Sequence, residues 1–274
     1  MAILNGGNGK DTLTGTDGDD TLNGGNGKDI VVGGKGTDTA FLGNGDDKFI
    51  WNPGDGNDTV DGGNGFDTLD FRGADRAAGE TFTIEANGSG GATFFRPGGI
   101  IGLTSVERIQ FEAQGAHADN ITIDDLTGTG VKQVAIDLGG GMPGGGDGVA
   151  DTVAIKSAPG QAITFTDNNG TVTVLGLASG VTISNFEVGV GGDQLFINGV
   201  LQTVHDGQTV TVTAENSNNT GGTSTATDGS HATGFALLGQ AMASSFVTTG
   251  DGHGATPIAD QPSSHQPLLT HPHA

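Results

Sequence analysis

Large apolar residues recur with a nine-residue spacing over the first quarter of the chain, and Gly and polar residues fill the intervals. The recurring apolar residues are Leu13, Leu22, Val31, Ala40, Phe49, Val60 and Leu69. Side chains alternate between the two faces of a strand, so these residues point inward while neighbours such as Thr12 and Thr14 point outward. The pattern predicts three-residue strands joined by six-residue turns, with two repeats completing one coil.

The predicted turns carry an equally regular set of residues. Seven copies of GGxGxDxUx, where U is a large apolar residue, run over 6–50 and, after Trp51 and Asn52, over 53–70. The sixth position is always aspartate, namely Asp11, Asp20, Asp29, Asp38, Asp47, Asp58 and Asp67. Stacked coils would align the aspartates of odd repeats along one edge and those of even repeats along the other. Such carboxylates repel one another unless a cation lies between them.

Calcium suits these turns, because it is a hard cation that takes six to eight oxygen ligands. Segments such as GGNGKDTLT, GGNGKDIVV and GGNGFDTLD resemble the hemolysin-type calcium-binding repeat of RTX proteins. The resemblance covers Gly6 to Asp70. It implies a right-handed parallel β-roll that holds Ca²⁺ between turns two repeats apart.

The resemblance also implies three kinds of calcium ligand, the first being the seven position-six aspartates. The second kind is the turn carbonyl, at Gly7, Gly9, Gly18, Gly25, Gly27, Gly34, Gly36, Gly43, Gly45, Gly56 and Gly65. The third is an oxygen-bearing side chain at position three, in Asn8, Asp17, Asn26, Asn44, Asp55 and Asn64. Lys35 departs from this pattern, so we expect a weak site between the second and fourth repeats. The insertion of Trp51 and Asn52 similarly puts in doubt the calcium sites that include the turn of the sixth repeat.

Two other interpretations of the acidic turns are less favoured. Asp and Gly are common in polar turns that bind no metal. Turn formation alone, however, does not require Asp at one fixed offset in every copy. An EF-hand is discarded because no segment has the D-x-[DN]-x-[DN]-G pattern followed by its Glu.

After Phe71 the period weakens, but runs rich in Val, Ile, Thr and Phe continue and predict further strands. The runs are 81–85, 92–96, 106–111, 120–123, 131–137, 151–155, 162–166, 171–175, 181–186 and 193–197. Their spacing of roughly ten residues fits either a β-solenoid that continues the roll or an antiparallel sandwich. Two segments resemble decayed repeat turns and favour the solenoid: Gly145-Gly146-Asp147-Gly148 before Asp151, and Gly191-Gly192-Asp193. The predicted domains are therefore 1–72 and 73–214.

The last predicted segment, 215–274, is a linker, a short helix and a flexible tail. Residues 215–230 are mainly Asn, Thr, Ser and Gly, a linker composition. The apolar stripe that predicts the helix consists of Phe235, Leu238, Met242 and Phe246. From Ile258 the chain contains three Pro and three His. A solvated tail is favoured there over a transition-metal site at His265, His271 and His273.

Charge and composition limit the classes of molecule that we expect this protein to bind. The formal net charge of −22 disfavours nucleic acids and anionic membranes and favours cations. The sequence has no Cys, no run of ~18 apolar residues and no basic-then-apolar leader at its start. In RTX proteins a C-terminal segment typically directs one-step (type I) secretion. The resemblance therefore implies a secreted protein that meets the type I machinery through residues 234–274.

The sequence shows no sign of a catalytic domain. It lacks the HExxH and GxSxG motifs and a nucleophilic Cys. We therefore predict an all-β, noncatalytic, secreted calcium-binding protein whose roll folds on Ca²⁺ outside the cell. The alternative is a C-terminal calcium-binding and secretion module of a larger RTX enzyme or toxin. Chemistry on sugar chains along a β-helix face is a third, weaker possibility, and the sequence does not indicate an oligomeric state.

Overall fold

The structure is a computed structural model in which every described element is a β-strand. It describes residues 1–74, 79–113, 115, 117–139, 147–189 and 191–214, and the backbone of four later strands. The strands form one 11-stranded sheet, one 12-stranded sheet and one separate pair. The all-β class predicted from the sequence is confirmed.

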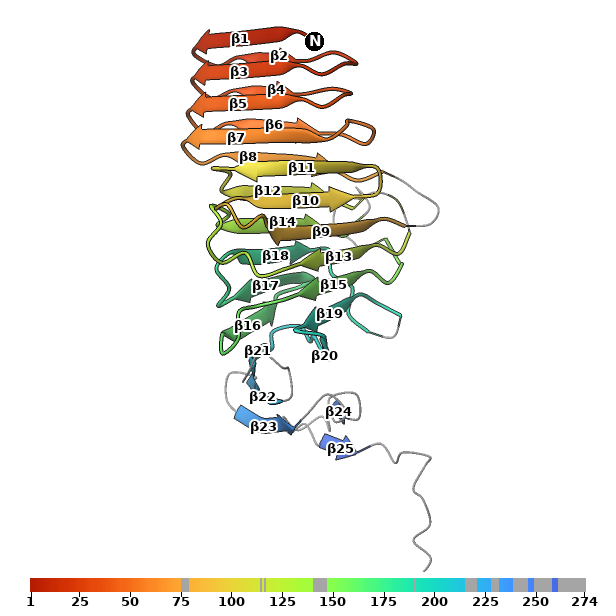
Figure 1. The fold of residues 1–274 in the computed structure, drawn as a ribbon. Coiled ribbons are helices and arrows are strands. Elements are labelled where there is room, and N and C mark those ends of the chain that lie inside the picture. Colours follow the sequence, from red (N-terminus) through yellow and green to blue (C-terminus); the bar gives the residue numbers. More distant parts are fainter. Residues whose placement is uncertain are drawn as a thin grey trace, which may run out of the picture.

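The first eight strands form a parallel roll with its strands in two sheets (Figure 1). The first sheet contains β1 (Ile3–Asn8), β3 (Thr21–Asn26), β5 (Thr39–Asn44) and β7 (Asp58–Asn64). The second contains β2 (Thr12–Thr14), β4 (Ile30–Val32), β6 (Lys48–Trp51) and β8 (Thr68–Arg72). Ile3 pairs with Thr21, and Thr12 pairs with Ile30. One coil therefore takes two repeats, as predicted, and all seven position-eight residues are buried.

The strands of the first sheet are longer than the predicted three residues. β1, β3 and β5 have six residues each and β7 has seven, because they run on through positions one to three of the next repeat. The Gly and Asn residues in these positions also pair, as Gly7 does with Gly25 and Asn8 with Asn26. Six-residue turns therefore remain only where the chain passes from the second sheet to the first.

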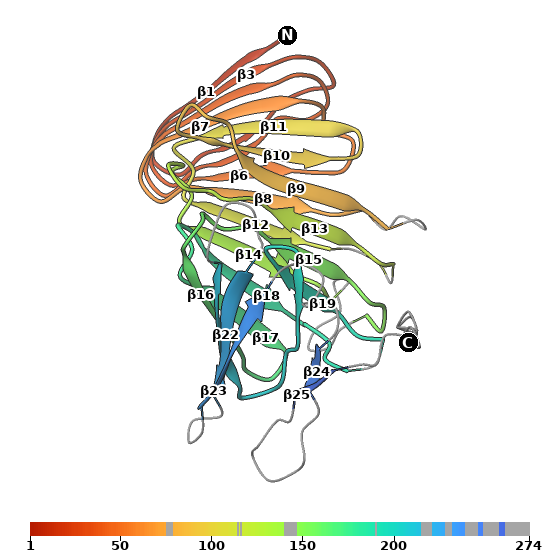
Figure 2. The same ribbon diagram turned by 60° about the horizontal axis from the view of Figure 1, so that its bottom comes forward.

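The roll continues directly into an irregular solenoid. In the first sheet β7 is followed by β11 (Gly99–Thr104), β10 (Ala92–Arg96), β9 (Thr81–Ala86), β13 (Asn120–Ile123), β15 (Thr152–Ile155), β19 (Gln194–Ile197) and β20 (Val200–Gln202). In the second, β8 is followed by β12 (Arg108–Glu112), β14 (Gln133–Asp137), β18 (Gly180–Ser184), β17 (Thr171–Leu175), β16 (Ala162–Asp167) and β21 (Thr209–Ala214). The view along the stack shows the two sheets facing each other (Figure 2). The solenoid alternative is confirmed over the sandwich.

The irregularity arises where antiparallel hairpins are inserted into the sheets. β10 pairs with both β9 and β11 in antiparallel fashion, whereas β11 pairs parallel to β7 and β9 parallel to β13. The second sheet stays parallel from β2 to β18 and becomes antiparallel afterwards. The strands at 99–104, 200–202 and 209–214 were not among the predicted runs.

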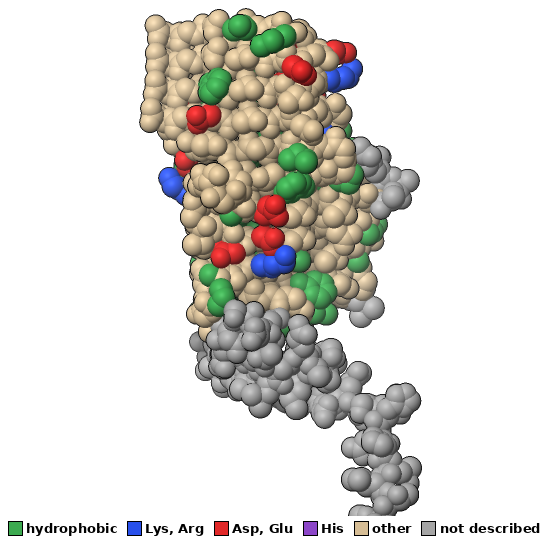
Figure 3. Space-filling view, viewed as in Figure 1, with side chains coloured by type: hydrophobic (Ala, Val, Ile, Leu, Met, Phe, Trp, Pro, Cys, Tyr) green, Lys and Arg blue, Asp and Glu red, His purple; other side chains and the backbone are tan. Residues whose placement is uncertain are grey.

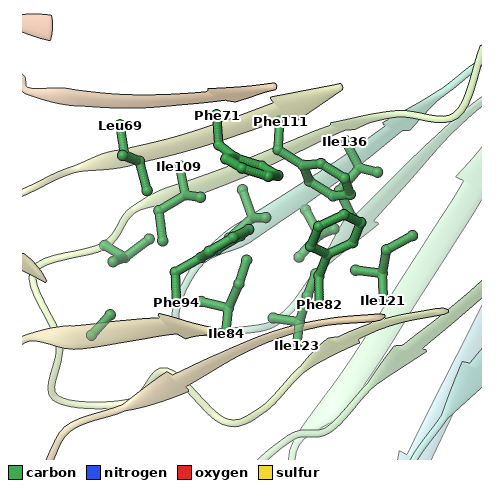
Figure 4. Packing of buried hydrophobic residues seen from close by; sticks show 14 of the residues in the cluster. Leu69, Phe71, Phe82, Ile84, Phe94, Ile109, Phe111, Ile121, Ile123 and Ile136 are labelled. Carbon is green, nitrogen blue, oxygen red and sulfur yellow. The ribbon is translucent and has the colours of Figure 1, made fainter. Parts of the chain in front are cut away.

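One hydrophobic cluster runs from the roll into the solenoid. It includes an aromatic group around Phe71, which packs on Trp51, Phe82, Phe94 and Phe111 with ring centroids 5.1–6.2 Å apart. Figure 4 shows Phe71 and Phe111 from one sheet meeting Phe82 and Phe94 from the other. Arg96 covers this group, with its guanidinium carbon 4.5 Å from the centre of the Trp51 ring.

The predicted C-terminal helix is wrong where the structure describes it. Phe235 and Leu238 lie in strand β23 (Ala232–Leu238), which pairs with β22 (Gly221–Thr227), and Phe246 begins β24 (Phe246–Thr248). β24 pairs with β25 (Ile258–Asp260), and Met242 and the three tail histidines lie outside the described residues. β22 also lies within the predicted linker. In the part of the chain that is described, no helix has the length and apolar character needed to cross a membrane.

Candidate metal centre

The position-six aspartates of odd repeats form a continuous column beside the second sheet. Each carboxylate Oδ1 accepts a hydrogen bond from the backbone N–H of the aspartate one coil earlier. The distances are 2.8 Å from Asp11 to Asp29, 2.7 Å from Asp29 to Asp47 and 2.9 Å from Asp47 to Asp67. The aspartates also link to the following strands, because the carbonyl of Asp29 accepts from the N–H of Lys48 at 2.9 Å. The backbone thus fixes each carboxylate between two coils.

The second carboxylate oxygen is the feature that points to a metal. Oδ2 is buried without a hydrogen-bond donor in Asp11, Asp29, Asp38, Asp47, Asp58 and Asp67. Asp29 and Asp67 are 0% exposed. A buried carboxylate oxygen without a partner is costly, whereas Ca²⁺ would take it as a ligand. These oxygens, which accept no hydrogen bond, are suited to act as ligands of the calcium ion that the sequence implies.

The even repeats form the matching column beside the first sheet. The N–H of Asp20 donates to Asp38 at 2.8 Å, and the N–H of Asp38 donates to Asp58 at 2.9 Å. Asp20 differs from the others because the Thr16 hydroxyl donates to its Oδ2 at 2.7 Å. This hydrogen bond is the main reason that the pKa of Asp20 is lowered. The two-edge arrangement predicted from the repeat period is present in the structure.

Lys35, the residue that breaks the position-three pattern, places its ammonium group on the exposed side of the turns of the second and fourth repeats. Its Nζ lies 3.0 Å from Oδ2 of Asp17, the position-three residue one coil earlier. The side chain therefore supplies a positive charge to the turns of the second and fourth repeats. A weak calcium site there, as expected from the sequence, stays a prediction.

The other position-three side chains are held by one another or by nearby backbone. Along the odd repeats each side-chain amide N–H donates to the side-chain oxygen of the asparagine one coil earlier, at 2.7 Å from Asn26 to Asn8, 2.7 Å from Asn44 to Asn26 and 2.8 Å from Asn64 to Asn44. Asp55 instead accepts from the N–H of Asn52 at 2.7 Å. The asparagines form an exposed ladder that joins the coils directly, and their assistance to calcium remains a prediction.

Acids outside the repeats extend the odd column and form a separate run beside the first sheet, and most of them were not foreseen from the sequence. Oε2 of Glu107 accepts from the N–H of Asp67 at 2.8 Å and so extends the odd column into the solenoid. A further run lies beside the first sheet, with hydrogen bonds of 2.6 Å from Glu80 to Asp119, 2.7 Å from Asp119 to Asp151 and 2.8 Å from Asp151 to Asp193. Asp151 follows the first suspected decayed turn, and Asp193 is the last residue of the second.

A local signal marks these additional acids. Each stands two residues before the first inward-facing residue of a strand, as in Glu107-Arg108-Ile109 and Asp119-Asn120-Ile121. The repeats place their Asp at the same offset before position eight. Searching for acid-x-apolar triplets rather than whole nonapeptides would have found them.

Burial changes the pKa of several of these aspartates. It raises the pKa of Asp58 and that of Asp67 to about 7 from an ordinary value of 3.8. It likewise raises the pKa of Asp151 to about 7 and those of Asp119 and Asp193 to about 6. In each case the larger effect is loss of hydration of the charged form, and neighbouring carboxylates add to it. Without a bound cation these aspartates take up a proton at a higher pH than an ordinary carboxylate does.

The geometry allows a calcium site to be assembled from successive coils. Among the described residues, no group of three or more His, Cys, Asp or Glu side chains converges on one point. Aspartates of neighbouring coils would therefore supply two carboxylates, and turn carbonyls would complete the six to eight oxygens. On the face drawn in Figure 3 acidic side chains over the roll appear singly, while all position-six aspartates except Asp11 are buried.

A parallel roll with aligned carboxylates in Gly-rich turns defines a calcium-binding repeat solenoid. The family model of the RTX calcium-binding nonapeptide repeat matches four copies, at residues 5–40 and 54–70. The chain thus contains RTX calcium-binding repeats, and these repeats bind calcium ions. No curated protein matches the chain.

The stacking order predicts unequal roles for two aspartates of the odd column. Asp29 contacts the coils on both sides, whereas Asp11 contacts only the coil that follows. Asp29→Ala should therefore weaken two sites, each by at least about tenfold, while Asp11→Ala should weaken one. Isothermal titration calorimetry with CaCl₂ on the full chain measures both changes. Equal losses of affinity would contradict this register.

The raised pKa values predict opposite pH dependences with and without calcium. A raised pKa in the folded state stabilises the fold below the unfolded value near 4 and loses this effect as pH rises through about 7. In chelator, lowering the pH from 7.5 to 5 should therefore increase the strand signal in circular dichroism. With Ca²⁺ present, the same acidification should weaken binding, because protons compete for the carboxylates. Asp67→Asn is the control: it should reduce the response to acid in chelator.

Proposed function

We propose that this protein is a secreted, noncatalytic calcium-binding protein whose roll completes its folding on Ca²⁺ outside the cell. The observation that carries the proposal is the column of buried Oδ2 atoms without donors. RTX repeats are typical of secreted proteins. Extracellular calcium modules commonly bind at ~10⁻⁴ to 10⁻³ M, so such a roll would stay unfolded at low cytosolic Ca²⁺ and fold after export.

The noncatalytic part of the proposal rests on the missing motifs, and one hollow in the described surface bears on the sugar-chain alternative. A hollow of about 330 Å³ lies beside β14, β17 and β18, lined by Phe66, Lys132, Gln133, Thr173, Val174, Leu175, Gly180, Val181 and Thr182. Lys132 is the one ionisable residue of this lining. Hydrolysis of sugar chains ordinarily uses a pair of carboxylates, and this hollow does not provide them. The third possibility raised by the sequence gains no support from it.

Export through the C-terminal part is the component that can be tested most directly. Deletion of residues 234–274 should leave the protein inside producing cells that carry a type I secretion system. The readout is the fraction of full-length and truncated protein in the medium, with a cytosolic enzyme followed as a marker of lysis. Efficient export of the truncated chain would refute the C-terminal signal while leaving calcium binding intact.

The same roll would also serve as the C-terminal module of a larger enzyme or toxin, which is the alternative. The mass of the polypeptide that the native producer secretes separates the two. A product of the size of this chain supports the first proposal, and a much larger product that reacts with antibodies against the roll supports the second.

A further inference from the structure

A buried acid outside the repeats shares the signature of the position-six aspartates. Asp167 occupies the last residue of β16, on the inward face that also carries Ile163 and Phe165, and is 1% exposed. Its Oδ1 accepts from the N–H of Gly170 at 3.1 Å, and its Oδ2 is buried without a donor. None of the ion pairs among the described residues includes Asp167. An inward carboxylate of this kind is costly unless a cation or a proton neutralises it.

A second carboxylate is fixed next to it by the same turn. Asp167 and Asp206 form a parallel β-bridge, in which the N–H of Gly207 donates to the Asp167 carbonyl at 3.0 Å. The N–H of Asn169 donates to Oδ1 of Asp206 at 2.8 Å. Asp206 is exposed, so this side of the pair is open to water.

The hairpin between β16 and β17 sets the direction of these N–H groups. Asn169 and Gly170 both have positive φ, 51° and 78°, as in the two-residue turns that favour Asn-Gly. Hydrogen bonds between Asn168 and Thr171 close the turn. One N–H of the turn is directed to each carboxylate, so the backbone holds the two acids together.

Charge repulsion between the two acids is apparent in the pKa of Asp167. Burial is the larger cause that raises the pKa of Asp167, and the Asp206 carboxylate raises it further. No Lys, Arg or His is among the groups that shift it.

We propose that Asp167 and Asp206 bind a divalent cation, Ca²⁺ at extracellular concentration, at the turn between β16 and β17. The ligands on the page are carboxylate oxygens, which suit a hard cation, and water from the open side would complete the coordination. The site is separate from the residues matched by the repeat family. With only two protein carboxylates we expect weak binding, with a Kd of ~10⁻³ M.

Hydrogen exchange of the full chain, measured by mass spectrometry in chelator and in ~10 mM CaCl₂, tests the site locally. If Kd is ~10⁻³ M, peptides covering 162–175 and 203–214 should exchange about tenfold more slowly in calcium. Asp206→Asn and Asp167→Asn should each abolish this slowing while the roll peptides keep theirs. Asp125→Asn is the matched control, because it removes the same charge from a loop elsewhere and should leave the slowing unchanged.

The roll peptides in the same samples report the calcium binding of the repeats. Slowing in the roll but not at the hairpin would overturn this inference and leave the repeat sites standing. If calcium still slows hydrogen exchange of the hairpin peptides in both Asp206→Asn and Asp167→Asn, the effect is transmitted from calcium bound in the roll. This result would equally overturn the proposed site. Asp206 is exposed, so its substitution tests the inference even if Asp167→Asn disturbs folding.

Discussion

Removal of calcium from the full chain should unfold residues 1–72, whereas strands β9 to β12 of the solenoid should stay folded. The odd column places Asp11, Asp29, Asp47, Asp67 and Glu107 on successive coils, and none of the ion pairs found among the described residues includes them. A site occupied at about 100 times its Kd contributes about 2.7 kcal/mol to stability, and this contribution disappears with the ion. Hydrogen exchange in excess chelator should therefore become fast over 1–72 and remain slow over 79–113.

Magnesium at equal ionic strength is the control for screening of the carboxylates. Mg²⁺ demands a near-octahedral shell and dehydrates reluctantly, so it should restore little of the protection that Ca²⁺ gives. If residues 1–72 exchanged equally slowly in chelator and in calcium, calcium-dependent folding of the roll would be wrong.

A single methyl group added at Gly45 should disrupt the roll almost as severely as the removal of calcium. A Cβ on Gly45 would lie 1.4 Å from the Gly27 carbonyl oxygen, and the backbone there has a φ of 136°. Gly45→Ala must therefore separate two stacked turns in addition to straining its own backbone. We expect a loss of more than about 4 kcal/mol in calcium, measured by urea unfolding, with a much reduced affinity for Ca²⁺.

Gly9→Ala provides the matched control in the first coil. Gly9 also has a positive φ, 99°, but a Cβ there would meet nothing within 4 Å. Its substitution should cost only the backbone strain of about 1–3 kcal/mol. Equal losses for the two variants would indicate that backbone strain, rather than close stacking of the turns, dominates.

The roll can be predicted well from the sequence because each repeat contains the residues that determine its own turn and strand. Gly tolerates the turn, Asp precedes the strand, and position eight supplies the inward residue, so coil length and the two acidic edges follow from the period. The solenoid is harder to predict because hairpins of varying length separate its coils. Glu107, for example, lies 40 residues after Asp67 although the two are in contact.

The C-terminal strand shows a different limit of sequence reasoning. Phe235 and Leu238 are three residues apart, which fits one face of a helix, but they lie in β23 opposite the Thr-rich strand β22. Pairing with a neighbouring strand decides the structure, and a spacing of three apolar positions contains no information on that neighbour.

The junction between roll and solenoid has a consequence for how the roll grows. β7 and β8 pair with β11 and β12, which belong to the part of the chain built on the aromatic cluster. Each coil contacts only its neighbours, so the stability of the array depends on interactions between adjacent coils. The solenoid provides a folded end on which the first coil of the roll can form. At limiting calcium the coil of β7 and β8 should close first and the coil of β1 and β2 should fray. Titration would then give populations with different numbers of closed coils instead of one all-or-none transition.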